Sequence, residues 1–245
     1  MQALGIDIGG SGIKGAPVDV HKGKLLAKRV RIATPNPPTA KKVTQAVNEI
    51  VQYFNWESKI GVGFPGIVRD GHILTAANMH ESWVHVNAEQ LFTQRTQCAC
   101  TLINDADAAG LAEMHHGAGK GHKGKVILLT FGTGIGSALF LDGKLVSNTE
   151  FGHLQLRGKI AEARASDRAR SEEKLSWKSW GKRVAEYLAH LELLFSPDLF
   201  IIGGGASKNF DLFKKSLKRI HAEIVPALHG NSAGIVGAAM AASGA

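Results

Sequence analysis

Cysteine is scarce in this sequence, and long apolar runs are missing from it. Cys98 and Cys100 are the only cysteines among 245 residues, too few for a disulfide-stapled secreted domain. Two residues apart in an expected strand, they point to one face and are badly placed to bond each other, so we predict core thiols. No apolar run approaches the ~20 residues of a membrane-spanning helix, and the N-terminus lacks the basic region of a signal peptide. We therefore expect a cytoplasmic protein with no membrane partner.

Acidic residues are outnumbered by basic ones. The chain has 29 Lys and Arg against 21 Asp and Glu, a formal charge of +8. This excess suits an anionic partner such as nucleic acid, a membrane surface or a polyanionic substrate, but a solvated basic surface explains it equally well. A hydrophobic content of 44% is ample for a core, in one large domain or two small ones.

Glycine, by contrast, is abundant and concentrated in turns. The opening stretch Ala3–Ala16 reads as a strand, a turn at Gly9-Gly10-Ser11-Gly12 and a second strand. Glycines allow positive φ, and successive bare N–H groups form an anion-binding nest. The Asp7 carboxylate would repel a phosphate bound in such a nest unless a cation lay between the two, so Asp7 implies Mg²⁺. An ordinary glycine-rich hairpin is the alternative. A Walker loop is excluded, since Lys14 is followed by glycine.

A second copy of this turn lies about half the chain length further on. Leu128–Ala138 contains Gly132-Thr133-Gly134 where the first copy has Gly10-Ser11-Gly12, which indicates a duplicated domain. Phe131 lies near the place that Asp7 occupies in the first copy, so the turn itself does not require the acid. Two such turns and one acid predict a phosphate chain gripped from both sides, with one metal ion.

The order of expected elements also repeats. Each half gives three strands, a helix, a strand and a helix, with these elements expected: strands 4–8, 13–20, 24–32, 59–64, 99–103, 126–131, 135–141, 144–146 and 198–202, and helices 40–54, 87–94, 106–116, 177–195, 209–224 and 234–242. The charged segment 162–174 is expected to be exposed. This order resembles the ribonuclease H-like units of the actin-like ATPase fold, an α/β class with two similar domains around a cleft. We place the domains at 1–107 plus 232–245 and at 108–231.

Asp105 is the strongest candidate for a catalytic group. It follows an apolar strand and precedes a helix, the place where α/β sheets commonly carry active groups. A carboxylate there can take the proton of an attacking hydroxyl during phosphoryl transfer. The alternative is a helix N-cap, a role for which Asp107 competes.

Two further segments have polar groups suited to ligands. Glu150-Phe151-Gly152-His153 joins an acid to an imidazole, a good pair for sugar hydroxyls that both donate and accept, although a solvated acid and a buried histidine are the simpler reading. The run Ile201–Lys208 is a strand followed by three glycines, Ser207 and Lys208, which suits a nucleotide or simply a loop that begins a helix.

In combination these segments resemble the ROK family of repressors and sugar kinases. Gly5–Gly15 is similar to its first phosphate motif, Leu129–Ala138 to the second, Ile201–Lys208 to the adenosine motif, and Glu150–His153 to its E-x-G-H sugar segment. The helices at 104–113 and 234–242 are similar to its two connecting helices. The match narrows to the polyphosphate/ATP glucokinase branch, carried by 5–14, 129–141, 150–154 and 176–205.

The resemblance implies a Mg²⁺-dependent transfer of a phosphoryl group to the 6-hydroxyl of glucose, from polyphosphate, ATP or both, in a homodimer. Asp105 is then the base, and Asp7 orders Mg²⁺ through water. The implied sugar residues are Asn78, Asn104, Asp105, Glu150, His153 and Glu162. The implied donor residues are Gly9, Gly10, Ser11, Gly12, Lys14, Thr133, Gly134, Gly204, Gly205 and Lys208.

One departure concerns zinc. Most ROK kinases follow the sugar-segment histidine with a cysteine cluster that binds structural zinc, whereas residues 154–245 contain no cysteine. We expect no structural zinc, and the change leaves the alignment of Glu162 in doubt. Two basic groups are candidates to line a polyphosphate track: Lys120, Lys123 and Lys125, and Arg164, Arg168, Arg170, Lys178, Lys182 and Arg183.

Other readings stay open. A strictly ATP-dependent hexose or amino-sugar kinase and a catalytically inactive sugar sensor share the same motifs. A ROK transcriptional repressor requires a DNA-binding helix-turn-helix ahead of the kinase-like core. The first expected strand begins at about residue 3, so we expect no nucleic-acid partner.

Overall fold

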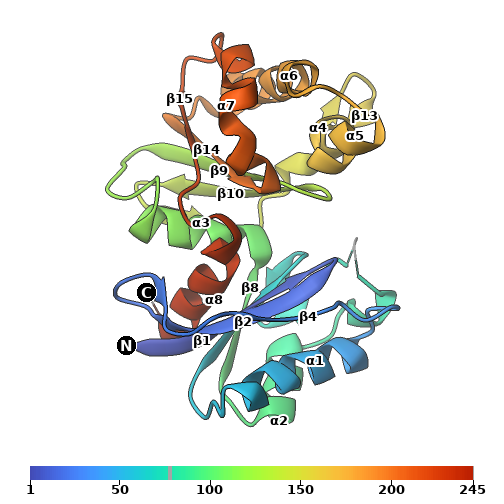
Figure 1. Cartoon of the computed structure of the whole chain (residues 1–245), viewed down its shortest axis with the longest axis vertical. Coiled ribbons are helices and arrows are strands. Elements are labelled where there is room, and N and C mark those ends of the chain that lie inside the picture. Colours follow the sequence, from blue (N-terminus) through green and yellow to red (C-terminus); the bar gives the residue numbers. More distant parts are fainter. Residues whose placement is uncertain (77–78, 245) are drawn as a thin grey trace. The chain divides into compact units, whose positions relative to one another are not determined.

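The computed structural model describes residues 1–76 and 79–244, and in it the chain forms two compact units. The first unit comprises Met1–Ala112 and Ser232–Ala245, and the second comprises Glu113–Asn231. Each contains its own mixed sheet with helices (Figure 1). Among the described residues, none of the helices is long and apolar enough to cross a membrane.

The first unit is built on a six-stranded sheet. The strand order is β3-β2-β1-β5-β8, with β4 also paired to β2. Its elements are β1 (Gln2–Gly9), β2 (Gly12–Asp19), β3 (Lys24–Leu25), β4 (Val30–Ile32), α1 (Ala40–Tyr53), β5 (Ile60–Phe64), the small hairpin β6 (Val68–Arg69) and β7 (His72–Ile73), α2 (Ala88–Thr96), β8 (Cys100–Asn104), the start of α3 (Asp105–His116), and α8 (Ala233–Ser243).

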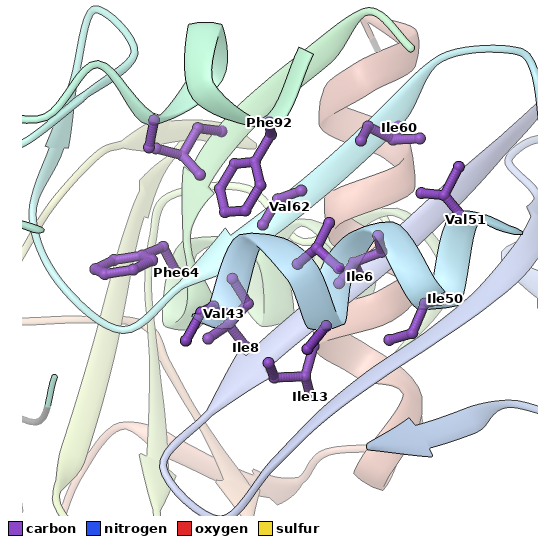
Figure 2. Close-up of a cluster of buried hydrophobic side chains, with 14 of the residues drawn as sticks. Ile6, Ile8, Ile13, Val43, Ile50, Val51, Ile60, Val62, Phe64 and Phe92 are labelled. Carbon is purple, nitrogen blue, oxygen red and sulfur yellow. The ribbon is translucent and has the colours of Figure 1, made fainter. Parts of the chain in front are cut away.

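One face of this sheet packs against α1. Alternate residues of β1, namely Leu4, Ile6 and Ile8, are fully buried in the core that this face forms with the helix, as the two-residue period of a strand requires. Figure 2 shows Ile6 and Ile8 beside Val43 and Ile50 of α1. The helix begins where predicted, because the Thr39 hydroxyl accepts a hydrogen bond from the Lys42 amide.

The opposite face of the sheet packs against α8 so closely that strand and helix backbones are in direct contact. A Cβ at Gly5 would lie 1.8 Å from the Ile235 carbonyl oxygen, and one at Gly61 equally close to that of Ala238. Only glycine permits this approach. Asp7, which lies between Ile6 and Ile8 in β1, points to this same face, toward α8.

The second unit repeats the arrangement with five strands in the order β11-β10-β9-β14-β15. Its elements are β9 (Lys125–Phe131), β10 (Ile135–Leu141), β11 (Lys144–Val146), the small hairpin β12 (Gln155–Leu156) and β13 (Lys159–Ile160), α4 (Ala161–Ala165), α5 (Asp167–Glu172), α6 (Trp177–Phe195), β14 (Leu199–Gly204), α7 (Phe210–Phe213) and β15 (Glu223–Pro226). Its core joins Leu129 and Phe131 of β9 to Trp180 and Tyr187 of α6.

Two expected elements are wrong. The strand 24–32 is split into β3 and β4, because Pro17 of β2 has no N–H to offer the neighbouring strand; its carbonyl still accepts from the Leu26 amide. The helix 209–224 ends early and gives way to β15, since the Glu192 carboxylate accepts the amide hydrogens of His221 and Ala222 and the chain then pairs with β14.

The charged segment 162–174 is also different from its prediction. It forms α4 and α5 and is anchored rather than wholly exposed: Ala165, Ser166 and Ala169 are buried. Small residues spaced among the charges pack inward while the long charged side chains stay at the surface.

Candidate active site

The first glycine turn, Gly9–Gly12, joins β1 to β2 in the first unit and places one acid opposite one base. Asp7 and Lys14 are direct cross-strand partners, and the Lys14 Nζ lies 3.4 Å from the Asp7 Oδ2. Both side chains are partly exposed. The lysine predicted to face the donor phosphates thus also neutralises the acid predicted to order the metal.

The first turn of α8 presses on this acid. A Cβ at Gly234 would lie 2.9 Å from the Asp7 Cγ, so this position needs glycine for a reason that the sequence did not reveal. Among the described residues no group of three or more His, Cys, Asp or Glu is arranged to hold a metal ion. Asp7 is a single carboxylate, which fits Mg²⁺ because this ion is commonly held by one or two carboxylates, water and substrate phosphates.

The glycines of the two phosphate turns do not use the positive φ that glycine allows. Positive φ occurs at Gly204 in the third glycine stretch, whereas Gly9, Gly10 and Gly12 lack it. Close approach explains Gly12 instead, since a Cβ there would lie 2.6 Å from the Arg31 Nε. Arg31 was missed as a site residue, although its place in the third strand of the expected meander could have found it: it pairs with Lys14.

Asp105 begins α3 directly after β8, as predicted. The N-cap role that we weighed for it belongs to its neighbour: Asn104 is buried, and its Oδ1 accepts from the amides of Ala106 (2.9 Å) and Asp107 (3.0 Å). The Asn104 Nδ2 donates to the Gly66 carbonyl at 3.1 Å. Asp105 Oδ1 accepts from the Ala106 amide at 2.8 Å. Asn104 therefore holds the backbone that carries Asp105.

The second glycine turn, Gly132–Gly134, joins β9 to β10 and has a carboxylate on it. The Glu162 Oε2 accepts from the Ile135 amide at 3.3 Å, and a Cβ at Gly134 would lie 2.4 Å from that oxygen. Thr133 is exposed at the tip. Glu162, one of the sugar residues implied by the resemblance, is therefore in contact with a predicted donor motif of the same unit.

The sugar segment is packed beside this same turn. Glu150 precedes a 3₁₀ helix at Phe151–His153, and its Oε2 lies 3.8 Å from the His153 Nε2. A Cβ at Gly152 would lie 2.3 Å from the carbonyl oxygen of Ile135, the residue that follows the turn. Burial raises the pKa of the Glu150 carboxyl; His153 opposes that shift and Glu162 adds to it. The second unit thus gathers Glu150, His153 and Glu162 around one turn.

The third glycine stretch carries the other predicted donor residues of the second unit. Gly204 ends β14, and a Cβ on it would lie 2.6 Å from the Phe131 amide nitrogen, so the third glycine stretch packs against the strand that leads to the second turn. Gly205 and Lys208 are exposed. Asn78 lies outside the described residues.

Much of the second basic group is paired with acids. Arg164 binds Glu186 at 3.0 Å, Arg170 binds Asp167 at 2.8 Å and stacks on Trp177, and Arg183 binds Glu173 at 2.6 Å; in the first group, Lys125 Nζ donates to the Phe195 carbonyl. Five residues of the two basic groups are exposed and form no ion pair in the described part of the chain: Lys120, Lys123, Arg168, Lys178 and Lys182.

Comparison with known proteins gives close relatives. The polyphosphate glucokinase of Mycobacterium leprae is 46% identical over 243 residues, which cover 99% of this chain and 75% of that protein. The crystal structure of inorganic polyphosphate/ATP-glucomannokinase from Arthrobacter sp. strain KM superposes with a TM-score of 0.95 at 48% identity, covering 99% and 98% of the two chains. A ROK family glucokinase from Streptomyces griseus, solved in complex with glucose and AMPPNP, gives a TM-score of 0.88 at 28% identity over the whole of both chains.

These similarities confirm the expected fold, the two-unit α/β architecture of actin-like kinases. They also confirm the resemblance to polyphosphate-using glucokinases. The ROK family pattern matches residues 3–165, which include both glycine turns, Asp105 and the Glu150–His153 segment. The chain belongs to the ROK family.

Proposed function

We propose that this protein is a glucokinase that transfers a phosphoryl group from polyphosphate, ATP or both to the 6-hydroxyl of glucose. The relatives named above support the reaction and its substrates. One observation at the end of β8 carries the assignment of the base. Asn104 caps α3, so the cap does not depend on the carboxylate of Asp105, the first residue of the helix.

Asp105 acts as the general base. The 6-hydroxyl attacks the terminal phosphorus of the donor while its proton passes to the Asp105 carboxylate. The new bond joins the sugar oxygen to phosphorus, the bond to the donor's bridging oxygen breaks, and a shortened polyphosphate or ADP leaves. Phosphoryl transfer requires mainly alignment and charge neutralisation, so one positioned base suffices.

The second unit supplies acceptors for the sugar. Carboxylates accept hydrogen bonds from hydroxyl groups, and the imidazole of His153 both donates and accepts. Glu150, His153 and Glu162 lie together around the second turn, which supports their joint role in holding glucose. Asn78 and Asn104 remain proposed sugar ligands on the strength of the resemblance.

The donor phosphates bind at the glycine turns. Backbone amides of Gly9–Gly12 and Thr133–Gly134, with Lys14, receive them, and 204–208 holds the far end of the donor. Mg²⁺, when bound, would neutralise charge on the transferred phosphate, and Asp7 would hold it through water. A homodimer stays a prediction.

A kinase restricted to ATP is the second candidate, since the Streptomyces griseus glucokinase was solved in complex with AMPPNP. A sensor without activity is the third. Purified protein incubated with glucose, Mg²⁺ and either ATP or long-chain polyphosphate distinguishes the three by the glucose 6-phosphate formed. We expect product with polyphosphate, and a loss of about 10²–10⁴-fold in rate in Asp105→Asn. Product with ATP alone selects the second candidate, and no product with either donor rejects a glucokinase.

A further inference from the structure

Strand β4 and the residues just after it lie beside the first glycine turn. Two of their side chains, Arg31 and Thr34, are hydrogen-bonded to that turn. We propose that Arg31 and Thr34 form a clamp that fixes the peptide planes of the first turn and thereby sets affinity for the donor phosphates. The proposal rests on the donor role given above to this turn.

The clamp consists of two hydrogen bonds to the turn's own carbonyl groups. The Thr34 Oγ1 donates to the Gly9 carbonyl at 2.5 Å, and the Arg31 Nη2 donates to the Ser11 carbonyl at 2.5 Å. β4 is paired to β2 with Arg31 opposite Lys14, so the sheet itself delivers Arg31 to the turn. Gly12 has no side chain to keep the guanidinium away.

These two bonds determine the direction of two amide groups. In a planar trans peptide the C=O of one residue and the N–H of the next point in opposite directions. Because the Gly9 carbonyl points to Thr34, the Gly10 amide points away from it. The Ser11 carbonyl likewise points to Arg31, and the Gly12 amide points away.

Such fixing is valuable in a turn made almost entirely of glycine. Glycine has the greatest conformational freedom of all residues, and that freedom is lost when an anion orders the turn. A turn already fixed by side-chain hydrogen bonds binds its ligand with a smaller entropic cost. Thr34 and Arg31 therefore prepare the amides before the donor arrives.

Arg31 also leaves a positive charge at the turn. Its guanidinium is exposed and has no acid within ion-pair distance in the described part of the chain, unlike Lys14, which is paired with Asp7. Its bond to Ser11 uses one of five N–H donors. The charge attracts phosphates, whether they belong to ATP or to polyphosphate.

The test separates the clamp from a general effect on folding or on charge. The variants are Thr34→Val, which removes the hydroxyl at similar size, Thr34→Ser, which keeps it, Arg31→Gln and Arg31→Lys. The control is Lys28→Gln, which removes one exposed charge between β3 and β4, in a residue with no clamp bond. The measurements are the KM for ATP, polyphosphate and glucose, and calorimetric binding of inorganic tripolyphosphate without glucose.

We expect Thr34→Val and Arg31→Gln to raise the KM of both donors and the Kd of tripolyphosphate about tenfold, the loss of one hydrogen bond with a charged or ordered partner. The KM for glucose stays within about twofold, Thr34→Ser restores binding, and Arg31→Lys restores part of it. A donor KM and Kd equal to those of Lys28→Gln, or a parallel rise in the KM for glucose, overturns the clamp. If the wild type binds tripolyphosphate but forms no glucose 6-phosphate, the proposed function fails while the binding series still decides on the clamp.

Discussion

The two glycine hairpins are both antiparallel strand–turn–strand units, but they differ in turn length and in the residues that lie beside the turn. Two pairs back from the pair that closes the turn, the first hairpin has Asp7 opposite Lys14 and the second has Leu129 opposite Ser137, with two residues left unpaired in the first turn and three in the second. The first pair is an ion pair, whereas Leu129 is fully buried in the core. The chain therefore uses two hairpins of similar topology for two chemical purposes.

Ser137 shows what the second hairpin does with its position. Its hydroxyl donates to the Thr149 carbonyl at 2.7 Å and accepts from the Phe151 amide at 2.9 Å. These bonds hold the backbone on both sides of Glu150. Where the first hairpin has a lysine at its surface, the second has a buried hydroxyl that positions the sugar segment.

The groups that lie on the turns differ in the same way. A guanidinium covers Gly12 of the first turn, and a carboxylate covers Gly134 of the second. Positive charge favours a phosphate, whereas a carboxylate favours hydroxyl groups and repels phosphate. The difference indicates that the first turn is concerned mainly with the donor and that the second also serves the sugar.

The strongest test of this comparison is Asp7→Asn. Because the amide has no charge to order a metal ion and its water, we expect kcat to fall about 10–100-fold with either donor and to recover in part at high Mg²⁺. Glucose binding, measured by calorimetry, should not change. Asp19→Asn, at the far end of β2, is the matched control. Equal loss in both variants would contradict a special role for Asp7.

A pair of glycine substitutions tests the division between donor and sugar. Gly12→Ala forces Arg31 to move, and Gly134→Ala forces Glu162 to move, since each Cβ would lie within 2.6 Å of the side chain above it. We expect Gly12→Ala to raise the donor KM about tenfold and leave the glucose KM unchanged, and Gly134→Ala to raise the glucose KM by a similar factor, with or without a rise in the donor KM. If Gly134→Ala leaves the glucose KM unchanged, or Gly12→Ala raises it, the two turns do not differ in the way described.

The smallest expected effect is a shift in pH dependence. Glu150 accepts more strongly from a sugar hydroxyl when it is ionised, and burial raises its pKa. As pH falls through that raised pKa, kcat/KM for glucose should fall, at higher pH than an ordinary glutamate would give. In Glu150→Gln the remaining acid limb should lie at lower pH, on a reduced kcat/KM. An unmoved limb would show that another group controls it. Stability has the corresponding sign: partial burial makes ionisation of Glu150 cost free energy, so its contribution is best at low pH and is lost as pH rises through its folded pKa.

Sequence reasoning succeeded best where a local pattern coincides with a packed element. The helix Trp177–Phe195 and the strands Ile135–Leu141 and Lys144–Val146 are confirmed at both ends. It failed at 209–224, where an apparently helical run contains a strand. There the Glu192 carboxylate, distant in sequence, takes the amides that a helix would have used. Hydrogen bonds between distant residues override propensity in this way.

The site shows the same limit. Asp105, Asp7 and the two glycine turns could be found because each lies at a strand end with a recognisable composition. Thr34 and Gly234 could not be found from composition, and Arg31 only from its place in the third strand, since the importance of all three comes from the groups that they touch in the folded chain. Glu162 was named only by resemblance, and its contact with the second turn is a tertiary fact.

The sequence by itself determined the repeated strand–turn–strand frame and the order of its elements, because alternation of apolar residues and glycine turns are local properties of the chain. The tertiary structure decided which side chain lies on each turn. Strand pairing brings Arg31 to the first turn, and α4 brings Glu162 to the second. The reason is geometric: a pattern of neighbours in sequence does not specify the register of distant strands, and register determines which charges meet.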